Sequence, residues 1–285
     1  MIDLDAYFGR LGHAGPRNAT LATLSAICAN HTAAIPFENF DALLGTAPLL
    51  TPAALQAKLV RQRRGGYCYE QNALLRLVLL ELGFQVTSLA ARVVWMRAPD
   101  APRRARSHML LSVTVPHAAD PPYLVDVGFG GHLLGAPLRF VTGLVQRTPG
   151  GIERIAVQTV DGADEFALEA ELPTGWMPVY RFTLEAHRPV DYEPLNWYTA
   201  THPGSIFRHN LRLERLTPQC RVGLLNDKLT LRPVGGPVEV RRIADARELG
   251  RVVDEVFDLA APVSAGALFE RIPKRLDTAW LPPTA

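Results

Sequence analysis

The sequence predicts an α+β fold with helices first, an antiparallel sheet or barrel in the middle and a small mixed α/β region at the end. Residues 1–84 carry apolar side chains at helical spacing, whereas the chain from residue 85 onward forms short β-branched or apolar runs separated by Pro, Gly and Asp. At 285 residues the chain can bury a sizeable core in one large domain or in two to three small ones. We therefore expect three regions, residues 1–84, 85–190 and 191–285.

Three stretches of the first region are typical of helices. The apolar residues of "TLATLSAICANH" (20–31) recur at helical spacing, which places Cys28 on the buried stripe as a small core residue. In "TPAALQAKLVRQ", Thr51 is a plausible N-cap and Pro52 suits the first helical turn. A third helix, "YEQNALLRLVLLELGF", is expected to end at Gly83.

Strands are expected beyond the helices. The clearest runs are "QVTSLAARVVWM" (85–96), "HMLLSVTV" (108–115) and "YLVDVGFG" (123–130), and further runs extend to residue 185. Three short strands are then expected around residues 211–240, and helical patterns cover residues 245–260 and 264–272.

Composition excludes several classes of protein. The formal net charge is only +2, and the short cluster "RQRRGG" (61–66) is too small to indicate a nucleic-acid surface. No stretch reaches the ~18 uncharged apolar residues that a membrane span needs. Asp3 and Asp5 stand where a signal peptide would be basic, so a cytoplasmic location is expected. The three cysteines form neither a CxxC pair nor a zinc-type cluster, and no metal is expected.

Cys68 has the sequence context of a reactive thiol. It lies in "RGGYCYEQN" (64–72), where Gly65 and Gly66 allow a tight turn directly before an apolar helix. The nucleophile is the thiolate, and the unpaired N–H groups and positive dipole at a helix N-terminus favour that form. Helix starts also carry unreactive cysteines, so this context alone leaves both readings open.

A base and a carboxylate are available on two neighbouring predicted strands. Among eight histidines, His108 opens the apolar run 108–115, where a rigid strand can hold it inward. Asp126 lies within the apolar run 123–130, where an unpaired charge would be costly. Its partners could be the N–H groups of the following Gly-Phe-Gly-Gly turn, or a histidine on the adjacent strand. A hairpin would bring His108 close to Asp126, giving Cys68, His108 and Asp126 the roles of nucleophile, base and orienting group.

Five segments together resemble the arylamine N-acetyltransferases. They are "PFENF" (36–40), "RGGYCYEQN" (64–72), "SHMLLSV" (107–113), "YLVDVGFGG" (123–131) and "NWYTATHPGSIF" (196–207), in the order of the family and over most of the chain. The resemblance implies an N-terminal helical bundle, a central antiparallel β-barrel and a C-terminal α/β lid, with a cysteine-protease-like catalytic core. Two departures are small: Tyr69 where Phe is common, and Phe40 where Leu is common.

The resemblance also implies a reaction and a set of site residues. Cys68, His108 and Asp126 match the catalytic triad of a ping-pong acetyl transfer from acetyl-CoA to arylamines, hydrazines or N-hydroxyarylamines. Acetyl-CoA is then a co-substrate, no tightly bound cofactor is expected, and the chain is expected to be a monomer or weak homodimer. The implied acceptor pocket contains Phe37, Phe129 and Phe207, and the implied CoA contacts are Ser107, Gly128 and Gly130. Arg64 and Glu38 are interpreted as a structural pair that fixes the Cys68 loop.

Three other functions are compatible with parts of this pattern. A cysteine protease or transglutaminase-like enzyme could use the same Cys, His and Asp, but the local C-G-[SA]-C-[WY] signature of papain-like proteases is missing. An amide synthase that closes macrolactam rings would keep the fold and change the reaction. A binding module without catalysis is disfavoured by the intact triad.

Overall fold

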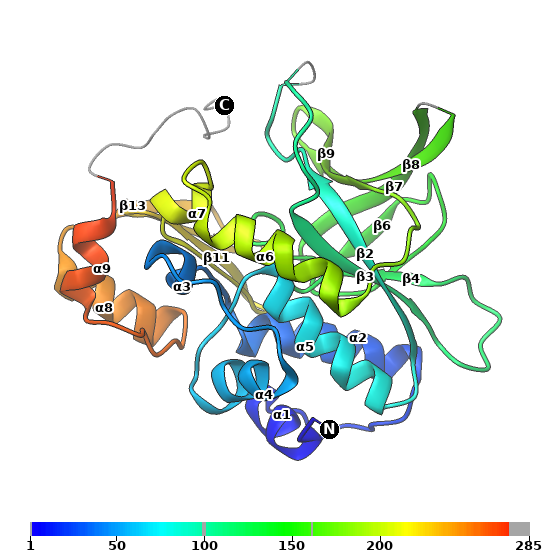
Figure 1. The fold of residues 1–285 in the computed structure, drawn as a ribbon, viewed down its shortest axis with the longest axis horizontal. Coiled ribbons are helices and arrows are strands. Elements are labelled where there is room, and N and C mark those ends of the chain that lie inside the picture. The colour runs from blue at the N-terminus through cyan, green and yellow to red at the C-terminus, as the bar shows by residue number, and fades with distance from the viewer. Residues whose placement is uncertain (1, 99–100, 161, 274–285) are drawn as a thin grey trace.

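The computed structural model describes residues 2–98, 101–160 and 162–273 and confirms the α+β class (Figure 1). The first region is helical, with bounds α1 (Leu4–Leu11), α2 (Leu21–Ala34), α3 (Phe40–Leu43), α4 (Pro52–Leu55), the π-helical turn η1 (Gln56–Arg61) and α5 (Cys68–Glu81). Helix α5 packs against strands of the barrel on one side and lies beside the other helices on the other (Figure 1). This central position explains why Leu74, Leu75, Val78 and Leu79 are fully buried, whereas Leu80 on the outer face is exposed.

The predicted helix signals act as expected. The Thr20 hydroxyl accepts a hydrogen bond from the Thr23 N–H at the start of α2. The Thr51 hydroxyl accepts one from the Ala54 N–H at the start of α4. Beyond the end of α5, Gly83 adopts a φ of +90°, and the Phe84 N–H returns to the Leu79 carbonyl. The left-handed glycine therefore ends this helix as the sequence predicts.

The middle of the chain forms an eight-stranded antiparallel sheet that curls into a nearly closed barrel. Its strands are β2 (Gln85–Val93), β3 (His108–Thr114), β4 (Tyr123–Val125), β5 (Leu138–Arg139), β6 (Gln146–Thr148), β7 (Gly151–Val160), β8 (Ala163–Leu172) and β9 (Gly175–Phe182), in the spatial order β5-β4-β3-β2-β9-β8-β7-β6. An isolated bridge from Thr142 to Ile155 and a 2.8 Å hydrogen bond from the Gly143 N–H to the Ile155 carbonyl connect the segment after β5 to β7, the strand next to the other edge of the sheet.

The predicted hairpin between the His108 and Asp126 segments is present. Strand β3 pairs antiparallel with β4, and Leu111 faces Val125 in the register. Asp126 is the first residue after β4, while His108 is the first residue of β3. Both side chains therefore lie at the same end of the hairpin.

A second, five-stranded sheet lies in the C-terminal part of the chain. It contains β10 (Arg212–Leu216), β11 (Cys220–Leu225), β12 (Lys228–Pro233) and β13 (Glu239–Arg242), preceded in space by β1 (Phe37–Glu38) from the helical region. The sequence predicts three strands in this region, whereas the structure has four, β10 to β13. The fourth, β13, is exposed along its whole length, so it has no alternation of buried and exposed residues to detect. The two residues of β1 are too few to give a strand pattern, and pairing with β10 creates that strand.

Short helices complete the C-terminal part. They are the 3-10 turn η2 (Pro189–Asp191), α6 (Tyr192–Thr201), α7 (Ile206–His209), α8 (Ala246–Arg251), the π-helical turn η3 (Val252–Val256) and α9 (Ala265–Arg271). Helices α8 and α9 share an apolar core with one face of the five-stranded sheet. The division at residues 84 and 190 remains a prediction, and residues 274–285 of the predicted third region lie outside the described residues.

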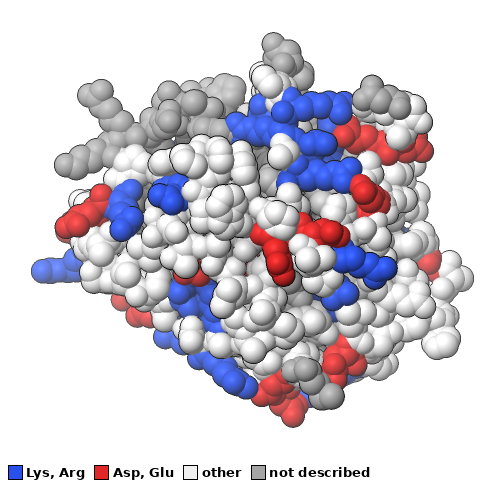
Figure 2. Space-filling model, in the orientation of Figure 1, with Lys and Arg blue, Asp and Glu red and all other residues white. Residues whose placement is uncertain are grey.

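The surface mixes both signs of charge over most of one face (Figure 2). Basic side chains gather at the upper end of the barrel in that view, and the segment between β2 and β3 contains Arg97, Arg103, Arg104 and Arg106. Among the described residues, no helix is both long and apolar enough to cross a membrane.

Candidate active site

Cys68 is the first residue of α5 and is almost completely buried, with 4% of its surface exposed. Its thiol donates a long hydrogen bond to the Ser107 carbonyl, with 3.8 Å between sulfur and oxygen. Ser107 directly precedes β3, so this contact brings the helix start against the strand that begins with His108. The N-terminal position exposes the sulfur to the positive end of the helix dipole.

His108 and Asp126 form a buried pair. The distance from His108 Nε2 to Asp126 Oδ2 is 2.7 Å, and neither residue is more than 3% exposed. Burial by itself lowers the pKa of His108, but the charge and hydrogen bond of Asp126, together with Cys68, outweigh burial and raise the pKa from 6.5 to about 10. Because Nε2 is engaged by Asp126, Nδ1 is the ring nitrogen left for Cys68.

Asp126 has both kinds of partner that the sequence allowed. Besides His108, its carboxylate accepts from the Gly128 N–H at 2.9 Å and from the Asn72 amide at 3.0 Å. Burial raises the pKa of Asp126, yet the charge of His108 and these hydrogen bonds hold it below 3.8. Asp126 is therefore ionised at neutral pH and faces a charged imidazole.

The three predicted pocket phenylalanines take part in two separate aromatic contacts. The Phe129 ring meets the His108 ring edge to face with centroids 5.1 Å apart, and Phe37 packs against Phe207 with centroids 6.0 Å apart. Phe37 and Phe129 are buried, whereas Phe207 is half-buried. Phe129 therefore lies against the triad histidine. Phe207 also packs on the ring of Tyr67, the residue before Cys68, with centroids 6.0 Å apart.

Neighbouring groups approach the backbone so closely at positions 128 and 130 that only glycine fits there. A Cβ on Gly128 would lie 2.7 Å from Cys68 Cα, and a Cβ on Gly130 would lie 2.4 Å from the Phe37 ring. These two glycines let the loop after β4 touch both the nucleophile helix and an aromatic side chain. Their predicted contact with CoA remains a prediction.

The other two cysteines have different surroundings. Cys28 is 1% exposed in the helical core, where burial raises the pKa of its thiol to about 12. Cys220 is half-buried at the start of β11. Of the three thiols, Cys68 is the one that lies beside a charged imidazole.

The comparisons with known proteins agree with this geometry. The sequence profile of the N-acetyltransferase family matches residues 20–264. An arylamine N-acetyltransferase of Mycolicibacterium smegmatis is 42% identical over 278 residues, which cover 97% of this chain and 99% of the relative.

This chain belongs to the arylamine N-acetyltransferase family.

Two more members of the arylamine N-acetyltransferase family extend the comparison. The structure of the Mycobacterium marinum arylamine N-acetyltransferase in complex with CoA is 38% identical, covers 95% of this chain and 99% of that one, and has a TM-score of 0.88. A Salmonella typhimurium protein named arylamine N-acetyltransferase / N-hydroxyarylamine O-acetyltransferase is 36% identical, with coverage of 90% and 88%. The similarity extends well beyond the segments that the resemblance rested on.

Two side chains of the site, Asn72 and Tyr180, are not among those that the sequence predicts. Asn72 follows Cys68 by one helical turn, donates to the Met109 carbonyl at 2.8 Å and accepts from the Val127 N–H at 3.1 Å. It thereby joins α5, β3 and the loop after β4, and its spacing of four residues from Cys68 could have indicated it. The Tyr180 ring lies 4.9 Å from the His108 ring, but nothing in the strand sequence around it indicates the contact.

Proposed function

We propose that this family member transfers an acetyl group from acetyl-CoA to the nitrogen of an arylamine, hydrazine or N-hydroxyarylamine through a thioester on Cys68. The observation that carries the proposal is the buried His108–Asp126 pair, 2.7 Å apart, beside a cysteine at a helix N-terminus. An imidazole that is charged at neutral pH stabilises a neighbouring thiolate.

The first half-reaction forms the thioester. The Cys68 thiolate attacks the carbonyl carbon of acetyl-CoA, the bond to the CoA sulfur breaks, and the His108 imidazolium gives its proton to that leaving thiolate. Asp126 keeps the ring oriented throughout by its hydrogen bond to Nε2. Free CoA leaves, and the acetyl group remains on Cys68.

The second half-reaction transfers the acetyl group to the acceptor. The amine nitrogen attacks the thioester carbonyl, neutral His108 accepts the amine proton, and the Cys68 thiolate leaves. This step restores the charged pair and releases the amide. We assign the Cys68 backbone N–H to the developing oxyanion, because the first N–H groups of a helix have no acceptor within the helix.

Binding of the acceptor and donor is assigned to the residues around the triad. We assign the acceptor to Phe37, Phe129 and Phe207, whose rings suit an aromatic amine. Ser107, Gly128 and Gly130 are assigned to the acyl and thiol end of acetyl-CoA, since Ser107 and Gly128 both contact Cys68.

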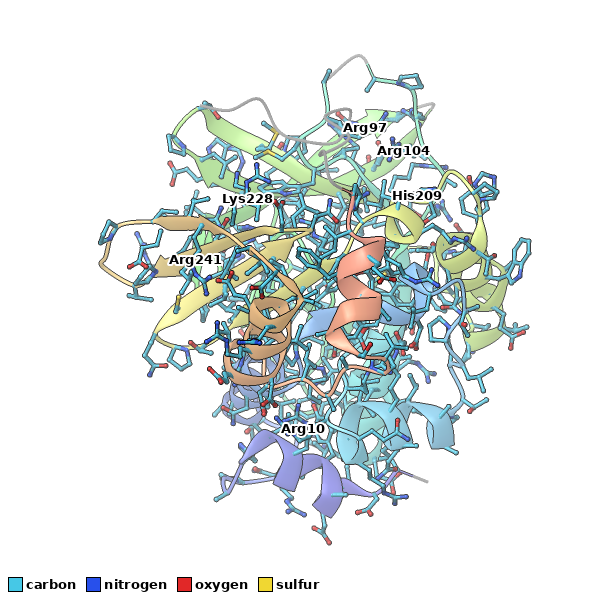
Figure 3. All side chains as sticks on the ribbon, turned by 90° about the vertical axis from the view of Figure 1, so that its left-hand side faces the viewer. Arg10, Arg97, Arg104, His209, Lys228 and Arg241 are labelled. Carbon is cyan, nitrogen blue, oxygen red and sulfur yellow. The ribbon has the colours of Figure 1, made fainter. Side chains whose placement is uncertain are left out.

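Cations near the barrel rim suit the phosphates of the donor. Arg97 and Arg104 lie at the upper edge of Figure 3, above His209 and Lys228. Burial and the nearby charge of Arg97 both lower the pKa of Arg104, so the two guanidinium groups are neighbours. Paired arginines bind phosphate oxygens in a fork geometry.

A donor and acceptor screen that follows free CoA release tests this function. Acetyl-, propionyl- and malonyl-CoA are each combined with arylamines and hydrazines, with Cys68→Ala as the control. We expect acetyl-CoA and an arylamine to release CoA catalytically in the wild type alone. Release by Cys68→Ala at the same rate, or in neither protein, would refute the proposal. The cytoplasmic location and the monomeric or weakly dimeric state remain predictions.

A further inference from the structure

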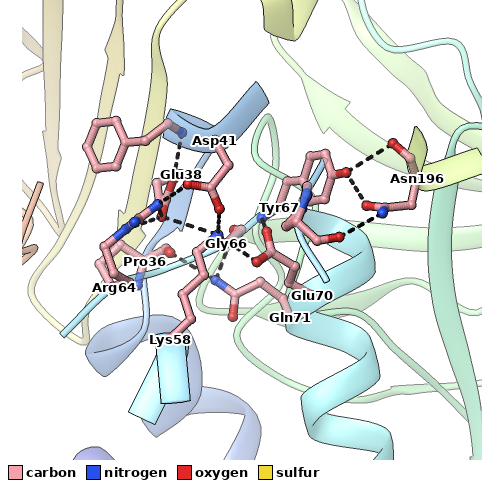
Figure 4. Close-up of polar contacts among 12 residues, drawn as sticks. Pro36, Glu38, Asp41, Lys58, Arg64, Gly66, Tyr67, Glu70, Gln71 and Asn196 are labelled. Atoms are coloured by element: carbon pink, nitrogen blue, oxygen red, sulfur yellow. Dashed lines mark hydrogen bonds and ion pairs between the residues drawn. The ribbon is translucent and has the colours of Figure 1, made fainter. Parts of the chain in front are cut away.

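A cluster of buried charges lies beneath the loop that leads to Cys68. Three carboxylates face two cations in it, namely Glu38, Asp41 and Glu70 against Lys58 and Arg64 (Figure 4). Arg64 Nε donates to Glu38 Oε1 at 2.9 Å, which confirms the predicted pair. The triad chemistry uses none of these five groups, although the cluster reaches the residue before the nucleophile.

Glu70 connects the cluster to the nucleophile. One carboxylate oxygen, Oε2, accepts from the Tyr67 N–H at 3.2 Å, and the other, Oε1, accepts from Lys58 Nζ at 2.6 Å. Tyr67 is the N-cap of α5 and immediately precedes Cys68. A Cβ on Gly66 would lie 2.8 Å from Glu70, so the loop backbone rests directly on this side chain. Glu70 therefore holds the backbone that presents the sulfur.

The charges around Glu70 do not balance. Three carboxylates share two cations, and Lys58 Nζ is divided between Glu70 and Asp41, each at 2.6 Å. Burial raises the pKa of Glu70 to about 7; Lys58 opposes the rise, and the charges of Glu38 and Asp41 add to it. Tyr67 also lies beside Glu70; burial raises the pKa of its hydroxyl, which stays neutral. Arg64 stays charged because the neighbouring carboxylates outweigh its burial.

We propose that Glu70 is a positioning residue for Cys68, whose carboxylate fixes the start of α5 when ionised and releases it when protonated. The ionised form is held by Lys58 and accepts the Tyr67 N–H, which aligns the loop. The neutral form loses its ion pair with Lys58, and that lysine shifts toward Asp41 and Glu38. The effect of Glu70 on acetyl transfer rests on the proposed function. Its effect on Cys68 does not, because the rate of Cys68 alkylation is measured without acetyl-CoA.

The test compares Cys68 alkylation in the wild type and in Glu70→Gln across pH. Glutamine keeps the size and the acceptor for the Tyr67 N–H but resembles the protonated form at every pH. Iodoacetamide labelling of Cys68, followed by peptide mass spectrometry from about pH 6 to about pH 8.5, gives the two rates. We expect the ratio of wild-type to variant rate to rise about five-fold, the size expected when one charge-assisted hydrogen bond is replaced by a neutral one, with its midpoint near pH 7. A ratio that is the same at every pH would overturn the proposal.

Two further variants keep the test decisive. Glu165→Gln, a buried carboxylate of β8 away from Cys68, is the matched control and is expected to give a constant ratio near one. Lys58→Gln leaves Glu70 in place without its cation, and the midpoint of its labelling profile should move to higher pH if Glu70 titrates as proposed. An unmoved midpoint overturns the proposal even if Glu70→Gln does not fold. The same series with acetyl-CoA then reports the effect on acetyl transfer separately.

Discussion

Replacing Asp126 by Asn changes one atom of the triad and leaves its shape intact. The Asn carbonyl can still accept from the Gly128 N–H and the Asn72 amide, which now lie 2.9 and 3.0 Å from Oδ1. The new amide group would then face His108 and donate to Nε2. A neutral imidazole that accepts at Nε2 carries its proton on Nδ1, the nitrogen left for Cys68. The variant therefore holds the histidine in a tautomer that cannot take a proton from the acceptor amine.

The expected losses follow from these contacts. Two of three hydrogen bonds to Asp126 persist and one charge-assisted bond is replaced, so we expect a stability loss of about 1–3 kcal/mol. Acetyl transfer should fall about 10³- to 10⁴-fold, the effect of the wrong tautomer in this arrangement of groups. Activity is thus expected to fall far more than stability.

The stability difference depends on pH with a definite sign. The pKa of His108 is raised from 6.5 to about 10 in the folded protein, chiefly because Asp126 overcomes the effect of burial. A raised pKa contributes stability that is complete below about 6.5 and is lost as the pH rises toward 10. The lowered pKa of Asp126 contributes stability that is lost in strong acid. The advantage of wild type over Asp126→Asn should therefore be largest near pH 6 and shrink toward pH 10.

Urea unfolding across this pH range and CoA release at neutral pH measure the two effects. Glu153→Gln is the matched control, because Glu153 also forms a buried pair with a histidine, 2.9 Å from His132. It should lose stability and keep acetyl transfer. The reasoning is refuted if Asp126→Asn transfers acetyl groups within ten-fold of wild type, or if its stability deficit grows from pH 6 to pH 10.

Three further predictions concern the thiol, the loop and the donor. Iodoacetamide near pH 7 should label Cys68 at least ten-fold faster than the half-buried Cys220, and equal rates would contradict a charged partner for Cys68. Gly128→Ala, whose Cβ would lie 2.7 Å from Cys68 Cα, should lower the free energy of unfolding by about 1–3 kcal/mol and slow thioester formation, as denaturation and quenched-flow measurements can check. Replacing Arg97 and Arg104 together by Ala should raise KM for acetyl-CoA about ten-fold without changing KM for the amine, and equal shifts in both would remove the phosphate assignment.

The residues with the strongest local constraints were predictable from sequence. Cys68 at a helix start, His108 at a strand start and Asp126 within an apolar run each follow from local pattern, and two consecutive strands bring the last two together. A charge in an apolar strand demands a partner, which is why Asp126 could be paired before the structure was known.

The remaining features depend on distant packing. Strand β1 exists because β10 lies beside Phe37 and Glu38, and two residues give no period to detect. Tyr180 reaches His108 because β9 pairs with β2, across a long stretch of sequence. Both contacts join segments that are far apart in the sequence and form only in the folded chain, so a single sequence does not reveal them.

The central claim is that Cys68 receives the acetyl group. Intact-protein mass spectrometry after incubation with acetyl-CoA, without an amine and under single-turnover conditions, tests this directly. We predict one acetyl group per chain, located on the peptide that contains Cys68, absent from Cys68→Ser and removed when an arylamine is added. No adduct in the wild type, or an adduct that survives in Cys68→Ser, would contradict the account.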